Sequence, residues 1–192
     1  MARLFSNPWK NKVGFKSRLK YIIRNEFYRW ILRKYCKRCK TVIDIACGPG
    51  QFMKTAAAMG YKSVGVDADE RHKAKNVIIR DLWKVKGKYD VVFNNMIIEH
   101  MDDQEKFVKK MASLSNNIAI TISAYASVSF WNVPDHVKPV TKISVSWLFR
   151  RHGFRTLLSM HIPFYKAVIV ISKKVTDKDK DWESKKIRSG FW

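Results

Sequence analysis

The pattern of apolar and polar positions changes character near residue 40. Residues 16–38 carry apolar side chains close to helical spacing, with Arg and Lys residues between them. This pattern predicts a basic amphipathic helix. From residue 41 onward, short apolar runs typical of β-strands alternate with helical patterns. We expect one leading helix followed by an α/β domain.

The alternation is regular enough to predict a sheet topology. Strands are expected at residues 41–46, 62–66, 76–79, 89–93, 117–123, 154–161 and 165–172, and helices at 51–59, 103–114 and 141–152. Such an order indicates an open, mostly parallel sheet with helices on both faces. The last two strands are too close for a helical crossover, so they should be antiparallel. Nine residues, 68–76, join the second and third strands, so the usual helix there must be shortened or lost.

The length of 192 residues fits one domain. We divide it into a basic arm and helix at residues 1–40, a main domain at 41–172 and a charged tail at 173–192.

Charge is distributed unevenly along the chain. There are 38 basic and 16 acidic residues, a net charge of +22, and residues 1–40 hold 13 basic residues against one acid, Glu26. A field of this sign attracts nucleic acid or an anionic membrane. The plain alternative is a lysine-rich solvated surface. For the leading helix, the plain interpretation is packing on its own domain, and the alternative is a helix that lies on a membrane surface or covers a substrate.

Cysteine usage and hydropathy indicate the compartment. Cys36, Cys39 and Cys47 do not make a disulfide framework, and the Cys36–Cys39 spacing has no second pair that would predict a zinc site. No apolar run approaches the roughly 20 residues that span a bilayer, and the N-terminus lacks the apolar core of a signal peptide. We expect a cytoplasmic protein without a bound metal, with peripheral membrane contact as an alternative.

The strongest chemical signal is the run 42–50, with the letters VIDIACGPG. A buried strand enters a tight turn in which Gly48 and Gly50 let the backbone approach a ligand. The next helix directs its first amides to the same place. Ligands of such sheets bind beyond the carboxyl ends of the strands.

Asp67 closes the second strand, 17 residues after Gly50. A carboxylate there can accept hydrogen bonds from both hydroxyls of a ribose. The dinucleotide fingerprint also needs a third glycine, but Met53 stands in its place. A ligand with a ribose and no pyrophosphate therefore fits better.

Residues 44–50 resemble motif I of class I S-adenosylmethionine-dependent methyltransferases, and the resemblance extends over residues 40–172. It implies a Rossmann-like three-layer sandwich with S-adenosylmethionine as cofactor. Asp67 looks like the ribose-binding acid, and Asp81 with Leu82 resembles the pair beside the adenine. The cofactor contacts implied by the resemblance are Asp44, Ala46, Cys47, Gly48, Gly50, Asp67, Ala68, Asp81, Leu82, Asn94 and Asn95.

Two further segments resemble one subgroup of this family. Residues 89–100 look like its fourth strand, with the frequent pair Glu99 and His100. Residues 131–137 followed by 148–154 are similar to members that modify small molecules, lipids or surface sugars. The resemblance thus implies methyl transfer to an acceptor of that kind.

The sulfonium of S-adenosylmethionine already activates the methyl group, so the protein must orient the acceptor and exclude water. A base helps if the acceptor is a hydroxyl or an ammonium. His136 is the first candidate because imidazole titrates near neutral pH, and His100 is the second. Glu99, Asp135 and Tyr125 are further candidates by location.

Two other functions stay open. The charge favours a nucleic-acid methyltransferase, although Asn94-Asn95-Met96-Ile97 stands where a base-methylating motif would be expected. The third reading is a cofactor-binding subunit without catalysis.

Overall fold

The computed structural model describes residues 15–125, 130, 132–162 and 166–176, with side chains from Arg18 onward. Its strands are β1 (Thr41–Ile45), β2 (Lys62–Asp67), β3 (Val77–Ile79), β4 (Tyr89–Asn95), β5 (Ser115–Ala124), β6 (Phe154–Ile162) and β7 (Ala167–Lys174). Its α-helices are α1 (Phe15–Tyr35), α2 (Gln51–Ala58), α3 (Gln104–Leu114) and α4 (Lys142–Arg151). Three short 3-10 helices are η1 (Glu70–His72), η2 (Leu82–Lys84) and η3 (Ile98–His100).

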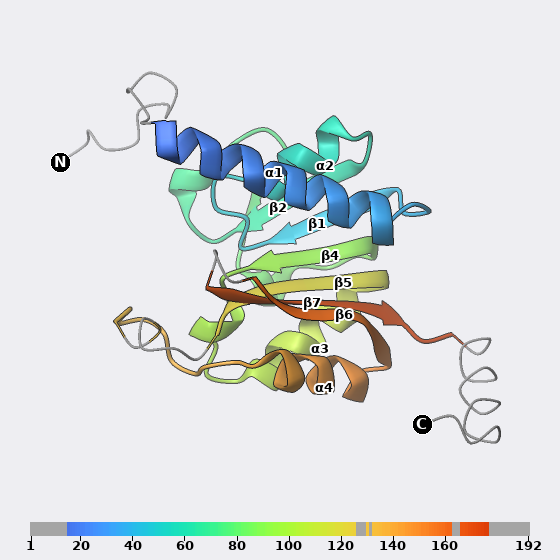
Figure 1. Ribbon diagram of the computed structural model, residues 1–192. Coiled ribbons are helices and arrows are strands. Elements are labelled where there is room, and N and C mark those ends of the chain that lie inside the picture. Colours follow the sequence, from blue (N-terminus) through green and yellow to red (C-terminus); the bar gives the residue numbers. More distant parts are fainter. Residues whose placement is uncertain (1–14, 126–129, 131, 163–165, 177–192) are drawn as a thin grey trace.

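The seven strands form one sheet in the order β3-β2-β1-β4-β5-β7-β6. The pairs among β1 to β5 are parallel, and β7 runs antiparallel to both β5 and β6. Figure 1 shows α1 and α2 on one face of the sheet and α3 and α4 on the other. The predicted three-layer sandwich with a reversed last strand is confirmed.

Successive side chains along the buried strands point to opposite faces of the sheet and contribute to two apolar cores. On β1, Val42 faces the core with α1 and α2, whereas Ile43 and Ile45 face the core with α3 and α4. Phe52 and Phe93 stack in the first core with ring centroids 3.5 Å apart. A strand buried on both faces carries apolar residues at nearly every position, which explains the continuous apolar runs in the sequence.

The edge of the sheet at β3 has less cover than the rest. The link from β2 to β3 contains only η1, which confirms the shortened connection predicted from its length. The link from β3 to β4 is similar, because it contains only η2. We did not predict that second shortening.

Element ends differ from the sequence-based expectations by a few residues. The helix expected over residues 16–38 ends at Tyr35, where residues 36–39 form a turn closed by the Cys39 amide on the Cys36 carbonyl. The fourth strand continues to Asn95 because it keeps pairing with β5 beyond the apolar run. Asp103 caps α3 by accepting from the Lys106 amide at 2.8 Å.

Within the described residues, no helix is long and apolar enough to cross a membrane. The predicted divisions at residues 40 and 172 stay predictions. Residues 1–14 of the expected arm and 177–192 of the expected tail lie outside the described part of the chain.

Candidate active site

The glycine loop after β1 turns through left-handed backbone conformations. Gly48 and Gly50 have φ values of 52° and 71°, and Ala46 has a φ of 53°. Only glycine adopts such values without strain, which explains the two glycines. Gly50 caps α2 without a side-chain hydrogen bond, so the first amides of α2 depend on other partners. The loop therefore presents backbone donors at the carboxyl edge of the sheet.

Asp44 lies beneath this loop and is almost fully buried. One of its oxygens accepts from the Met53 amide at 3.3 Å. Burial raises the pKa of Asp44 to about 8; the Met53 bond opposes the shift, and the charge of Asp67 adds to it. A cationic ligand group nearby would favour the ionised form of this carboxyl.

Asp67 ends β2 and holds the loop from the side. Its Oδ2 accepts from the Gly48 amide at 2.8 Å, and its Oδ1 accepts from the Asp69 amide at 2.9 Å. His72 Nδ1 lies 3.2 Å from Oδ1. A carboxylate has about four acceptor sites, so each oxygen retains capacity for a ligand hydroxyl. Asp67 is thus fixed in place and still able to bind a ribose.

Gly65, in the middle of β2, makes the close packing under the loop possible. A Cβ at this position would lie 2.6 Å from both Cys47 Sγ and Met53 Sδ. Met53 therefore fills the space between α2 and β2, where the dinucleotide pattern would have a glycine. We did not single out Gly65 from the sequence, although a glycine inside a strand signals such an approach.

The two asparagines at the end of β4 face opposite sides. Asn94 is fully buried and donates from Nδ2 to Thr121 Oγ1 at 2.9 Å, next to Met111 of α3. The buried Oδ1 of Asn95 has no hydrogen-bond partner among the described residues. The buried Oδ1 of Asn94 also has no hydrogen-bond partner among the described residues, but its side chain is 0% exposed, whereas Asn95 is half-buried. Asn95 is therefore the better placed of the two to accept from a ligand.

The residues predicted beside the adenine lie at the thinly covered edge. Asp81 is exposed and caps η2 by accepting from the Trp83 amide at 2.9 Å. Leu82 is half-buried, and Ala68 is exposed directly after Asp67. Their contacts with a cofactor stay predictions.

Glu99 is fully buried and connects η3 with the end of β5. Its two carboxylate oxygens accept from Ser123 Oγ at 2.9 Å and from the Ala124 amide at 3.0 Å. Its carbonyl accepts from the Val137 and Lys138 amides. Glu99 therefore acts as a clamp: its carboxylate holds η3 on the end of β5, and its carbonyl holds the 132–140 segment.

His100 and His136 come together through this clamp. Their ring centroids are 4.9 Å apart. His100 Nδ1 lies 2.8 Å from the Asp135 carbonyl, and His136 Nδ1 lies 2.9 Å from the Phe130 carbonyl. A carbonyl only accepts, so each Nδ1 carries the proton and each neutral ring has Nε2 as its basic atom. In the tautomer that suits these carbonyl contacts, each predicted base can accept a proton at Nε2.

The same pair meets the buried carboxylate. Glu99, His100 and His136 place one potential ligand atom each within 4.8 Å of one another. Such a distance would suit a cation, but the Glu99 oxygens already accept two hydrogen bonds. The expectation of no bound metal stays a prediction.

Comparison of the sequence with models of known protein families identifies the family of this domain. A family model described as a methyltransferase domain matches residues 16–159, more than half of the chain. The chain belongs to the methyltransferase domain family. The match spans the glycine loop, Asp67 and the His100–His136 pair, and it confirms the family resemblance drawn from motif I.

Relatives and solved structures agree with this assignment. The ubiquinone biosynthesis O-methyltransferase of Pelagibacter ubique is 30% identical, with 50% of this chain and 47% of that protein covered. The ribosomal protein L11 methyltransferase of Thermosipho melanesiensis is 33% identical over 42% of this chain and 38% of its own length. This methyltransferase domain thus spans less than half the length of these curated relatives.

Among solved structures, the fold is shared with magnesium protoporphyrin IX methyltransferase from Synechocystis, which was crystallised with S-adenosylhomocysteine. That structure has a TM-score of 0.67 and 18% identity, and 86% of this chain and 90% of that chain are covered. The N1-methyltransferase of 1,6-didemethyltoxoflavin from Burkholderia thailandensis has a TM-score of 0.64 and 14% identity, with 92% and 94% covered.

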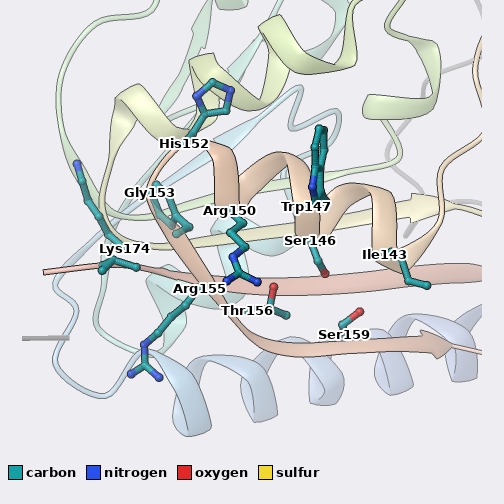
Figure 2. Close-up of a pocket in the computed structure, with 12 residues that line it drawn as sticks. Ile143, Ser146, Trp147, Arg150, His152, Gly153, Arg155, Thr156, Ser159 and Lys174 are labelled. Atoms are coloured by element: carbon teal, nitrogen blue, oxygen red, sulfur yellow. The ribbon is translucent and has the colours of Figure 1, made fainter. Parts of the chain in front are cut away.

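A groove of about 830 Å³ lies between α4 and β6 of the methyltransferase domain, away from the glycine loop. Figure 2 shows Arg150 reaching from α4 toward Thr156 of β6. The groove reaches Phe154 and Lys174, which pair at the start of β6, next to the amino end of β5. The groove therefore opens at the amino ends of the parallel strands, whereas the predicted cofactor site lies at their carboxyl ends.

The structure thus unites most of the predicted site at one edge and adds two residues. Gly48 is hydrogen-bonded to Asp67, Asp44 accepts from the Met53 amide of α2, and Gly50 caps the same helix. His72 and Gly65 are the two added residues, and only Gly65 left a signal in the sequence. His72 could not be found there because its approach to Asp67 depends on how η1 replaces the helix.

Proposed function

We propose that this methyltransferase domain binds S-adenosylmethionine at the glycine loop and transfers its methyl group to a hydroxyl of a small organic acceptor. The observation that carries the proposal is the hydrogen bond from the Gly48 amide to Asp67, which joins the loop to the predicted ribose acceptor. The family membership supports the same activity.

The groups around the glycine loop suit this cofactor. Gly48 and Gly50 hold the backbone in positions that a Cβ would strain, the Oδ1 of Asn95 lacks a partner among the described residues, and Asp44 provides a buried carboxyl. Bound S-adenosylmethionine supplies an electrophilic methyl group on a sulfonium. The buried carboxyl of Asp44 suits its amine, and the amide oxygen of Asn95 suits its adenosine. The carboxylate of Asp67 suits the two hydroxyls of its ribose.

The chain's own contribution to the chemistry is proton transfer and positioning. His136 Nε2, or His100 Nε2 beside it, accepts the proton of an acceptor hydroxyl, because each Nδ1–H is committed to a carbonyl. Glu99 keeps the segment that carries His136 and the Asp135 carbonyl on the sheet edge through its own backbone carbonyl. A base positioned in this way contributes about 10²–10⁴-fold.

An acceptor of small size is supported by the names of similar proteins. They refer to ubiquinone biosynthesis, magnesium protoporphyrin IX and 1,6-didemethyltoxoflavin.

We also place the protein in the cytoplasm, because its three cysteines are free thiols in the structure.

Calorimetric titration with S-adenosylmethionine and S-adenosylhomocysteine tests the cofactor site. We expect micromolar binding by the wild-type chain and a loss of about 100-fold in Asp67→Ala, because the variant removes both ribose acceptors. Asp102→Ala, which removes an exposed acid elsewhere, is the matched control. Absence of binding by folded wild-type protein would overturn the proposal.

The acceptor is tested by transfer of a labelled methyl group to a panel of phenols, catechols and a small RNA. Methylation of a hydroxyl compound that depends on His136 supports the proposal. Methylation of RNA alone would replace it with the nucleic-acid function.

A further inference from the structure

Helix α1 has two apolar faces, and only one of them is used by the domain. Tyr28, Ile31 and Leu32 point inward and are at most 3% exposed. Leu19, Ile22, Ile23 and Trp30 are 45%, 56%, 51% and 39% exposed. At 100° per residue these four side chains lie on the side of the helix opposite the buried one, and we call them the outer stripe.

Basic side chains surround the outer stripe. Arg18, Lys20, Arg33 and Lys34 are exposed on the same helix. Among the described residues of α1, the one acid is Glu26, and it is paired with Arg29. An apolar stripe with basic flanks is the arrangement of helices that lie in the interface of an anionic bilayer.

The location of α1 connects this stripe with the candidate active site. Gln51, the first residue of α2 after the glycine loop, donates from Nε2 to Asn25 Oδ1 at 2.8 Å and lies 3.4 Å from the Tyr21 carbonyl. The first half of α1 is thus fixed to the start of α2. Figure 1 shows this end of α1 on the side where the arrows of β1 and β4 end.

We propose that the outer stripe docks the protein on the surface of an anionic phospholipid bilayer, with the mouth of the candidate site close to that surface. The charge complementarity of the basic flanks carries the choice of partner. A nucleic acid would use the cations and leave Ile22 and Ile23 in water, whereas a bilayer interface accepts both kinds of side chain. The docking itself does not depend on the proposed methyl transfer.

Flotation of the full chain with vesicles tests the proposal. Vesicles of phosphatidylcholine with phosphatidylglycerol are compared with vesicles of phosphatidylcholine alone. We expect binding to the anionic vesicles and about tenfold weaker binding by Ile22→Asn/Ile23→Asn, since two apolar side chains no longer enter the interface. This variant keeps every charge, so it separates insertion from attraction.

The matched control is Ile143→Asn/Trp147→Asn on α4, whose side chains are 73% and 56% exposed. It should bind vesicles like the wild type, and circular dichroism with thermal unfolding should show both variants folded. Cofactor binding by calorimetry should be unchanged in both, which keeps this test distinct from that of the proposed function.

Three results would overturn the proposal. The first is equal vesicle binding by the Ile22→Asn/Ile23→Asn variant and the wild type. The second is no binding of the wild-type chain to anionic vesicles. The third is a wild-type dimer that the variant dissociates in analytical ultracentrifugation, because a second copy would then cover the outer stripe.

Discussion

Gly48 and Asp67 are joined by a hydrogen bond of 2.8 Å between the Gly48 amide and Asp67 Oδ2, across 19 residues of sequence. The bond fixes the glycine loop of β1 to the end of β2 before any ligand enters. A loop held in this way needs less ordering on binding, which favours affinity.

Asp67→Asn should weaken S-adenosylhomocysteine binding less than Asp67→Ala. The amide oxygen of asparagine can still accept from Gly48, but one carboxylate acceptor becomes a donor. We expect about tenfold weaker binding for the asparagine variant, equivalent to one lost hydrogen bond to a charged group. Equal losses in both variants by calorimetry would show that the link to Gly48 contributes nothing.

Gly65→Ala should distort the glycine loop from beneath. Its Cβ would stand 2.6 Å from Cys47 Sγ and Met53 Sδ. We expect a loss of about 1–3 kcal/mol in the free energy of unfolding, as for other overpacked cores, together with weaker cofactor binding.

Urea denaturation measures the stability of the Gly65→Ala variant. Adding Cys47→Ala makes room for one of the two clashes and should restore part of the stability. A fully stable Gly65→Ala variant with unchanged affinity would argue against close packing at this position.

Asp44→Asn should change how stability depends on pH. The folded-state pKa of Asp44 is about 8, above its ordinary value of 3.8. The folded chain therefore keeps a proton that the unfolded chain releases between these values, and the wild type loses stability as the pH rises through that range. The neutral asparagine avoids this loss, so its melting temperature should exceed that of the wild type at pH 8 and approach it near pH 4.

Cofactor affinity supplies a second readout for Asp44. If the ionised carboxylate receives a cationic group of the ligand, wild-type affinity should rise between about pH 6 and pH 9, because binding releases the proton. The asparagine variant should bind more weakly with little pH dependence over the same range. A wild-type affinity that falls with pH would contradict a role for ionised Asp44.

His136→Asn should reduce kcat about 100-fold while leaving cofactor affinity unchanged. The imidazole accepts the acceptor's proton at Nε2, and asparagine has no basic atom to replace it. His152→Asn, on the opposite edge of the sheet, is the control. If His136→Asn keeps full activity and His100→Asn does not, the base is the neighbouring ring.

Glu99→Ala should destabilise the fold more than an exposed acid does. It leaves the Ala124 amide and the Ser123 hydroxyl without their buried acceptor, at a cost of about 2 kcal/mol or more. Glu105→Ala, which breaks surface contacts with Arg151 and His152, should cost under about 1 kcal/mol. Similar melting temperatures for the two variants would refute the clamp.

The sequence predicted the sheet and the glycine loop well because both depend on local patterns. The mostly parallel sheet followed from the alternation of elements, its antiparallel last pair from the short link between the final strands, and the loop from the spacing of Gly48, Gly50 and Asp67. Residues at strand ends were harder to predict. Asn94 and Asn95 are equivalent in the sequence, but in the structure Asn94 is fully buried and bonded to Thr121, whereas Asn95 at the end of β4 is half-buried.

Contacts that form through space left no trace in the sequence. The Glu99 carboxylate could be suspected as a base from its position, but its two hydrogen bonds come from the far end of β5. The pairing of His100 with His136 likewise depends on carbonyls of the segment between β5 and α4. A one-dimensional pattern identified these residues but could not distinguish their roles.

The short strand β3 is joined to β2 and β4 by links that contain η1 and η2 in place of α-helices, which gives the domain a gradient of local stability. Three residues pair there with β2 in the structure, and Ile78 in their middle is exposed. Such a region exchanges its amide hydrogens through local opening long before the central strands do. Asp81 and Leu82, the residues predicted beside the adenine, therefore belong to the part of the fold that opens most readily. Occupancy by the cofactor and protection of this edge against exchange become two measures of a single equilibrium.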